Sequence, residues 1–127
     1  MRGVLDTSVL VAGGFDHLDA ELAISAVSLA ELHFGVLVAR DAVVRAARLE
    51  RVALVERDFV ALPVDDAVAR TYGRLAAAVQ EQGRQPRLRS LNLLIAATAV
   101  VHGVQLFTRN AADVAGLAPE LEVVALG

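Results

Sequence analysis

The chain has 127 residues, the size of one domain, and a formal net charge of −3. Cysteine is absent and all twelve basic side chains are arginine, which excludes thiolate nucleophiles, cysteine metal sites and mechanisms that need a lysine amine. Hydrophobic residues make up 56% of the chain, yet no apolar run reaches the ~18 residues that a membrane span needs. Because Asp6 interrupts the first apolar run, we expect no targeting leader, no membrane segment and a cytoplasmic location.

Short apolar runs alternate with amphipathic segments along the chain. Strands are expected at residues 3–6, 21–25, 60–64, 104–108 and 121–126. Helices are expected at 7–12, 28–39, 41–58 (one helix or two), 65–82 and 90–102, with a turn and a short helix at 110–117. No linker or repeat divides the chain, so we expect a single domain over residues 1–127. This alternation predicts an α/β fold with a central parallel sheet of four to five strands flanked by helices.

Four polar residues are expected at the same edge of this sheet. Asp6 ends the first strand, and Glu31 lies in the first turn of the helix after the second strand. Asn92 lies in the first turn of the helix at 90–102, and Asp113 follows the strand that ends at Thr108. Functional groups of parallel sheets gather at the carboxyl ends of the strands. Their shared position therefore indicates a site.

Each of these residues also has a purely structural interpretation. Asp6 is a suitable helix N-cap, and Glu31 follows Ser28 at the spacing of a capping box. Asp113 would serve in a solvated loop or as a cap, and Asn92 would serve as a polar group at a helix start. The histidines, by contrast, show no metal-ligand spacing: His17, His33 and His102.

Three stretches resemble the PIN-domain nucleases. "VLDTSVLVA" resembles their opening strand and first acid, and "SAVSLAELHFGV" resembles their second motif. "LNLLIAATAVVHGVQLFTRNAADVAGL" resembles their third and fourth motifs, as found in VapC-type toxins of bacterial toxin–antitoxin pairs. The resemblance implies a PIN-like three-layer sandwich and a Mg²⁺- or Mn²⁺-dependent endoribonuclease that cleaves cellular RNA.

The resemblance also implies a set of catalytic and metal-binding residues. The four acid positions of the family match Asp6, Glu31, Asn92 and Asp113. Carboxylates from separate segments hold Mg²⁺, which activates water and neutralises charge on phosphate. Asn92 keeps one oxygen but removes a negative charge and cannot accept a proton from water. We therefore expect weakened metal binding and reduced cleavage, whether the asparagine is an engineered change from aspartate or a natural feature.

Further polar residues near these positions are candidates for contacts to the substrate or to the metal ligands. Three of them belong to the motifs: Thr7, Thr108 and Asn110. Three arginines precede Asn92 in "GRQPRLRS", namely Arg84, Arg87 and Arg89. Guanidinium groups fit phosphate well, although a solvated turn between two helices is the alternative interpretation.

The implied partners are an RNA substrate and a cognate antitoxin protein. Excess aliphatic residues on the helices, including "YGRLAAAV" (72–79), favour a homodimer. The main alternative is a non-catalytic, degenerate PIN-fold module that binds RNA or protein, which Asn92 would explain. An aspartate-based phosphohydrolase is disfavoured, because Ser8 stands where its second aspartate is needed.

Overall fold

A computed structural model describes residues 2–15, 18, 21–117 and 119–127. Its strands are β1 (Arg2–Leu5), β2 (Glu21–Ser25), β3 (Ala61–Leu62), β4 (Gln105–Thr108) and β5 (Val123–Ala125). Its α-helices are α1 (Thr7–Ala12), α2 (Ala26–Val38), α3 (Ala42–Asp58), α4 (Asp66–Glu81) and α5 (Ser90–Val101). Two short 3-10 helices complete it, η1 (Pro86–Arg89) and η2 (Ala111–Val114). Among these residues, no helix combines the length and apolar content needed to cross a bilayer.

The strands form one five-stranded sheet in the order β3-β2-β1-β4-β5. Every neighbouring pair is parallel, and β1 pairs with both β2 and β4 at the centre. The expected parallel sheet is therefore confirmed, and the first strand occupies its middle position. In a parallel sheet the carboxyl ends of all strands share one edge, so residues that follow the central strands come together.

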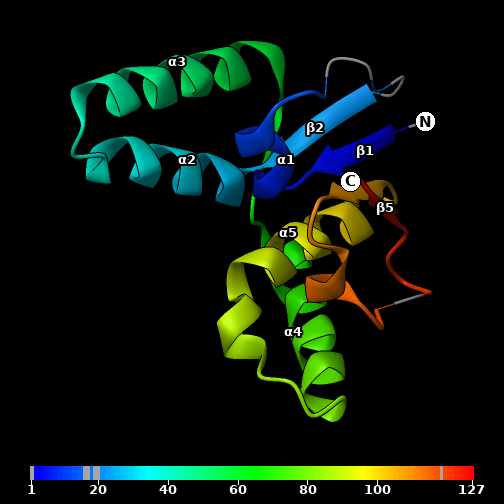
Figure 1. Ribbon diagram of the computed structural model, residues 1–127. Helices are drawn as coiled ribbons and strands as arrows, with labels where there is room; N and C mark the ends of the chain where they lie inside the picture. Colours follow the sequence, from blue (N-terminus) through cyan, green and yellow to red (C-terminus); the bar gives the residue numbers. More distant parts are fainter. Residues whose placement is uncertain (1, 16–17, 19–20, 118) are drawn as a thin grey trace.

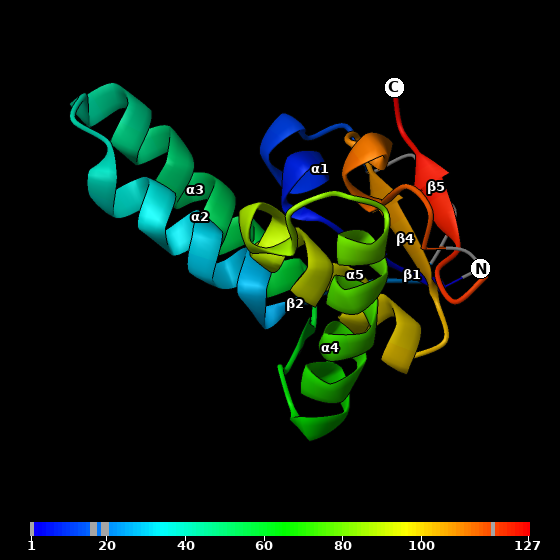
Figure 2. The same cartoon turned by 90° about the horizontal axis from the view of Figure 1, so that it is seen from below.

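Helices cover both faces of the sheet, which gives the three layers that the sequence predicts. Val4 and Leu106 pack with α4 and α5 in one buried cluster. Their strand neighbours Leu5 and Phe107 point to the other face and pack with α1, α2 and α3, because successive strand residues alternate in direction. Figures 1 and 2 show α4 beside α5, with the α2–α3 hairpin extending away from the sheet.

Some boundaries differ from the sequence-based expectation. Helix α2 begins at Ala26 rather than Ser28, because the Ser25 hydroxyl at the end of β2 accepts the Val27 N–H at 3.0 Å. The predicted capping box of Ser28 and Glu31 is therefore wrong, and Glu31 lies in the second turn of the helix. Strand β3 is limited to two residues, since Pro63 lacks the N–H that a longer ladder would need.

The long segment at 41–58 is one helix, and its start is capped as the acid before it suggests. The Asp41 carboxylate accepts the N–H groups of Val43 and Val44. Asp65 caps α4 in the same way, through the Val68 N–H at 3.0 Å. Each such cap is worth about 1 kcal/mol, so these local signals fix where the helices begin.

Candidate active site

A cleft of about 440 Å³ opens at the carboxyl edge of the sheet. Its lining comes from α1 and the residue before it, from α2, from α5 and from the loop after β4: Asp6, Thr7, Ser8, Val11, Ala12, Glu31, Asn92 and Asn110. Three of the four expected site residues, Asp6, Glu31 and Asn92, thus line one cleft. The fourth, Asp113, stands in η2 next to Asn92.

Asp6 is held rigidly at the centre of this edge. It follows β1 directly and is 8% exposed. Its Oδ1 accepts the Ser8 hydroxyl at 2.5 Å and the Val9 N–H at 3.3 Å, which makes it the N-cap of α1. The structural interpretation is therefore correct for this residue, and it does not conflict with a place in the cleft, because only Oδ1 makes these contacts.

Ser8 connects Asp6 to the opposite wall of the cleft. Besides donating to Asp6, its hydroxyl oxygen accepts the Arg109 N–H at 3.1 Å, from the loop after β4. Ser8 is not among the site residues expected from the motifs, although a hydroxyl two residues after an acid at a strand end is a local signal for such a contact.

Glu31 is held by a chain of two hydroxyl groups. Thr7 Oγ1 donates to Glu31 Oε1 at 2.6 Å and lies 2.9 Å from Ser28 Oγ. A hydroxyl has one hydrogen, and Thr7 gives it to the carboxylate, so the Ser28 hydroxyl must donate to Thr7. Ser28 is fully buried. It supports the site indirectly instead of capping α2, a role that its spacing to Glu31 does not predict.

Asn92 contacts Asp113 directly. Its Nδ2 donates to Asp113 Oδ2 at 3.3 Å, between α5 and η2. A carboxylate at position 92 would lack this donor and would place a second negative charge beside Asp113. Compared with an aspartate at this position, the asparagine therefore changes the site in two ways. It carries no negative charge, and its Nδ2 occupies one oxygen of Asp113 with a hydrogen bond.

Three comparisons with known proteins bear on this arrangement. A model of the PIN domain family matches residues 3–114. Ribonuclease VapC5 of Mycobacterium tuberculosis is 40% identical over an alignment of 114 positions, which covers 85% of this chain and 82% of that protein. Ribonuclease VapC4 of the same organism is 32% identical over an alignment of 131 positions, which covers 98% of this chain and 97% of that protein.

The chain belongs to the PIN-domain family. A solved structure of VapBC-5, a member of the VapBC family of toxin–antitoxin systems from Mycobacterium tuberculosis, superimposes with a TM-score of 0.84. That match has 36% sequence identity and covers 98% of both chains. The α/β architecture of this PIN domain is thus shared with a VapC-type relative, as the motifs predicted.

The remaining motif residues of this PIN domain have distinct positions. Asn110 lines the cleft, whereas Thr108 is 1% exposed and its Oγ1 accepts the Asn110 N–H at 3.0 Å. Thr108 therefore shapes the turn after β4 from inside, and Asn110 follows it at the border of the cleft.

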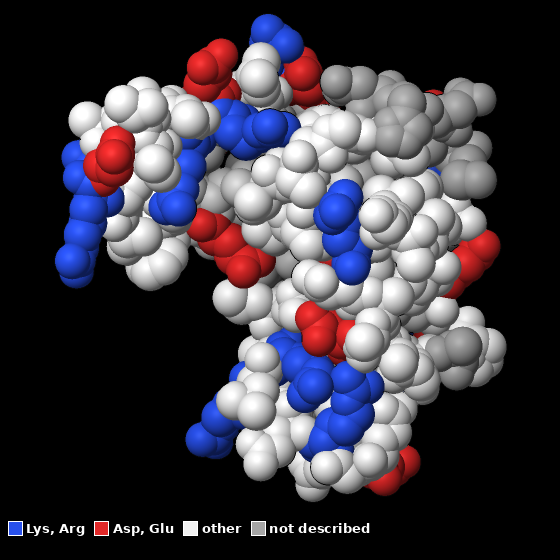
Figure 3. Space-filling model, in the orientation of Figure 1, with Lys and Arg blue, Asp and Glu red and all other residues white. Residues whose placement is uncertain are grey.

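The three arginines of the α4–α5 connection do not act together. Arg87 and Arg89 line a second hollow of about 290 Å³, which adjoins the cleft because Glu31 and Asn92 border both. Arg84 instead donates to the carbonyl groups of Ala112 and Ala115. In the space-filling view, arginine side chains gather over the α4–α5 half of the molecule, directly beside acidic side chains (Figure 3).

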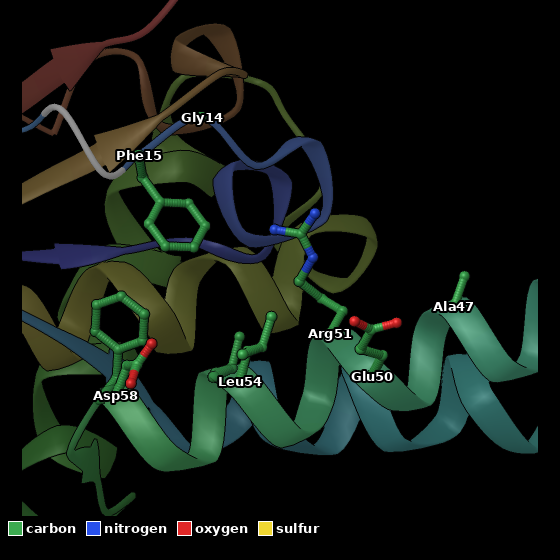
Figure 4. A pocket seen from close by; sticks show the side chains of 9 residues that line it. Gly14, Phe15, Ala47, Glu50, Arg51, Leu54 and Asp58 are labelled. Carbon is green, nitrogen blue, oxygen red and sulfur yellow. The ribbon is translucent and has the colours of Figure 1, made fainter.

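Further titratable groups lie along α3, where Arg48 and Arg51 line a hollow that shares Thr7 and Glu31 with the cleft. A hollow of about 490 Å³ along α3 holds Glu50, Arg51 and Asp58 beside Phe15 (Figure 4). There the hydrogen bond from Arg57 lowers the pKa of Asp58. His33 pairs with Glu56 at 2.7 Å between α2 and α3. His17 lies outside the described residues.

Within the ranges that the structure describes, no group of three or more His, Cys, Asp or Glu side chains is placed to hold a metal ion. Asp6 and Glu31 line the cleft, and Asn92 supplies an amide oxygen where the family pattern has an acid. These are hard oxygen ligands of the type that Mg²⁺ and Mn²⁺ take, so the donor set fits such an ion with one charge missing.

Proposed function

We propose that this PIN domain is an endoribonuclease toxin whose cleavage of RNA depends on Mg²⁺ or Mn²⁺. The observation that carries the proposal is the cleft at the carboxyl edge of the sheet, where Asp6 and Glu31 meet Asn92. Its relatives named ribonucleases, 32–40% identical over most of their length, support the same reaction class for this chain. Asp6, Glu31 and Asp113, with the Asn92 oxygen, would hold the ion.

The residues of the cleft divide the work of phosphodiester hydrolysis. Asp6 is the most rigid ligand, because Ser8 and the Val9 N–H fix its Oδ1. Thr7 orients the Glu31 carboxylate. That carboxylate would bind the ion directly or hold the water molecules on it. A bound divalent cation supplies an activated water and neutralises the charge that develops on phosphate.

The RNA backbone would approach along the hollow next to the cleft. Arg87 and Arg89 line that hollow together with Asn92, and guanidinium groups bind phosphate oxygens in a forked geometry. Asn110 adds a polar contact inside the cleft. The chain carries a net charge of −3, so local arginines rather than the overall charge would hold the substrate.

Asn92 attenuates this activity. Its amide oxygen is a neutral ligand, it cannot accept a proton from water, and its Nδ2 donates to Asp113 Oδ2. Exchange of one carboxylate for an amide therefore weakens ion binding at two ligands. The non-catalytic alternative, a degenerate module that binds RNA or protein, rests on this same residue and is tested by the same experiment.

A cognate antitoxin is the proposed protein partner. The relative of known structure belongs to a toxin–antitoxin family, which supports an antitoxin for this chain.

A homodimer stays a prediction. Leu75 and Val79 of the 72–79 segment, which favoured it, are buried in the chain's own core, so that segment gives no separate reason for dimerisation.

The deciding experiment restores the missing acid. We expect Asn92→Asp to cleave single-stranded RNA with Mn²⁺ at least 100-fold faster than the present chain, because general acid–base and ligand groups contribute about 10²–10⁴-fold. The control is Asn92→Asp combined with Asp6→Asn, which separates cleavage at this site from a contaminating nuclease. If Asn92→Asp neither cleaves RNA nor binds Mn²⁺, the non-catalytic module replaces the enzyme.

A further inference from the structure

The end of helix α4 reaches across to the turn that carries Asp113. Arg84 Nη2 donates to the Ala112 carbonyl at 2.7 Å, and its Nη1 donates to the Ala115 carbonyl at 3.4 Å. These two carbonyls flank Asp113 on either side. The guanidinium thus bridges the backbone of η2 and is engaged with the turn rather than with the cleft.

The residues that make this bridge are fixed by the way α4 ends. The Gly83 N–H donates to the Gln80 carbonyl at 2.9 Å, and the Arg84 N–H donates to the Val79 carbonyl at 3.2 Å. This paired pattern is a Schellman motif, and Gly83 has the positive φ of 79° that it requires. The Schellman motif therefore fixes the backbone conformation at Arg84, and with it the direction in which the Arg84 side chain leaves the helix end.

Gln82 adds a second contact to the same turn. Its Nε2 donates to the Gly116 carbonyl at 3.2 Å. Gly116 has φ of 82°, and a Cβ there would overlap the Gln82 amide group. The turn therefore depends on a glycine both for its backbone conformation and for the close approach of Gln82.

Besides these contacts, the turn is anchored by Val114, whose side chain is buried in the core cluster that α4 and α5 share. Helix η2 spans four residues and has no side-chain cap, and a 3-10 helix of this length has poor hydrogen-bond geometry. Within it, the Asp113 N–H donates to the Asn110 carbonyl at 3.0 Å, and the Ala115 N–H donates to the Ala112 carbonyl at 3.3 Å. A displacement of this backbone would move the Asp113 carboxylate away from Asn92.

We propose that Arg84, assisted by Gln82, is a positioning residue that holds Asp113 at the metal site. This assignment replaces the expected contact of Arg84 with phosphate. It rests on the proposed function only in taking Asp113 as a metal ligand, and the bridge itself consists of hydrogen bonds from Arg84 and Gln82 to backbone carbonyls. Arg84 acts through the backbone of η2. Its role therefore differs from that of Arg87 and Arg89, which border the hollow beside the cleft.

The test compares Arg84→Met and Arg84→Lys in the Asn92→Asp background. Arg74→Met is the matched control, because Arg74 also joins α4 to the C-terminal segment, through Glu120 at 3.0 Å, without touching η2. Three quantities are measured: the Kd for Mn²⁺ by calorimetry, hydrogen exchange at the Asp113 and Ala115 amides by NMR, and KM and kcat on RNA.

We expect Arg84→Met to raise the Kd for Mn²⁺ about 10-fold, the lower end of effects seen when groups that orient metal ligands are removed. Exchange at both amides rises and kcat falls, while KM stays constant. Arg84→Lys recovers part of each effect, and Arg74→Met changes none of them. In an Asp113→Ala background, Arg84→Met has no further effect on the Kd for Mn²⁺.

The proposal is overturned if Arg84→Met leaves the Kd for Mn²⁺ and both exchange rates unchanged and raises KM for RNA instead. That result would return Arg84 to a phosphate contact. If the Asn92→Asp chain cleaves no RNA, the proposed function fails, but exchange at Asp113 and Ala115 still decides whether Arg84 holds the turn.

Discussion

The Thr7 hydroxyl lies 2.6 Å from the Glu31 carboxylate, although the two residues are 24 positions apart in the chain. This contact joins α1 to α2 across the cleft and sets the direction of an acid that stands in the second turn of its helix. Its removal should therefore affect both stability and the site.

We expect Thr7→Val, which keeps the shape and removes the hydroxyl, to lower the free energy of unfolding by about 1.5 kcal/mol, the lower end for a hydrogen bond to a charged group. Urea denaturation measures the loss, and calorimetry with Mn²⁺ in the Asn92→Asp background measures the effect on the site. Thr7→Ser should restore both values. Equal stability and equal Mn²⁺ affinity in Thr7→Val would show that Glu31 needs no support from Thr7.

Asn92→Asp should make stability depend on the metal ion. Without metal, a carboxylate replaces an amide that lies 3.3 Å from Asp113, so repulsion destabilises the protein. At a Mn²⁺ concentration 100 times the Kd, binding adds about 2.7 kcal/mol. Denaturation with and without Mn²⁺ measures this difference. Asn92→Ala loses the hydrogen bond without gaining charge, and a similar response to Mn²⁺ in that variant would count against position 92 as a ligand.

Asp65→Ala should remove the cap of α4. The carboxylate accepts the Val68 N–H at 3.0 Å, and loss of such a cap costs about 1 kcal/mol. Asp66→Ala is the control, since Asp66 stands in the first turn and Asp65 is the capping residue. A thermal melt that ranks Asp66→Ala as the more damaging change would contradict the assignment.

Leu75→Ala should destabilise the sheet face that α4 and α5 cover. Leu75 is 1% exposed and belongs to that buried cluster, so its truncation costs about 2–5 kcal/mol. Leu37, with 77% of its surface exposed, offers the matched control, and its truncation should change stability by less than about 0.5 kcal/mol. Similar losses in both variants would mean that Leu37 is covered in solution.

The features that the sequence predicted correctly depend on local or periodic signals. A buried strand before Asp6, a helix that starts near Asp65 and an apolar helix from Ser90 each depend on neighbours a few residues away. Glu31 was expected at the same edge because it follows the second strand, and the family resemblance agreed with that position. The capping-box interpretation of Glu31 failed because Ser25, at the end of β2, offered an earlier cap.

Long-range contacts explain what the sequence could not predict. Arg84 bonds to carbonyl groups about 30 positions away, and no side-chain pattern marks a backbone acceptor in advance. Ser28 supports Thr7 from another helix, and its hydroxyl was read as part of a local cap. Both cases involve groups whose partners are chosen by the packing of separate elements rather than by spacing.

The uniform direction of the five strands has a practical consequence for handling the molecule. The turn between α5 and β4 lies at the amino edge of the sheet, where His102 and Val104 border Arg2 and Glu21. A strand of four residues, like β1, separates that edge from the cleft by about 13 Å. A fluorophore or an affinity tag attached at the exposed His102 would therefore report on RNA or antitoxin binding without contacting the residues of the cleft.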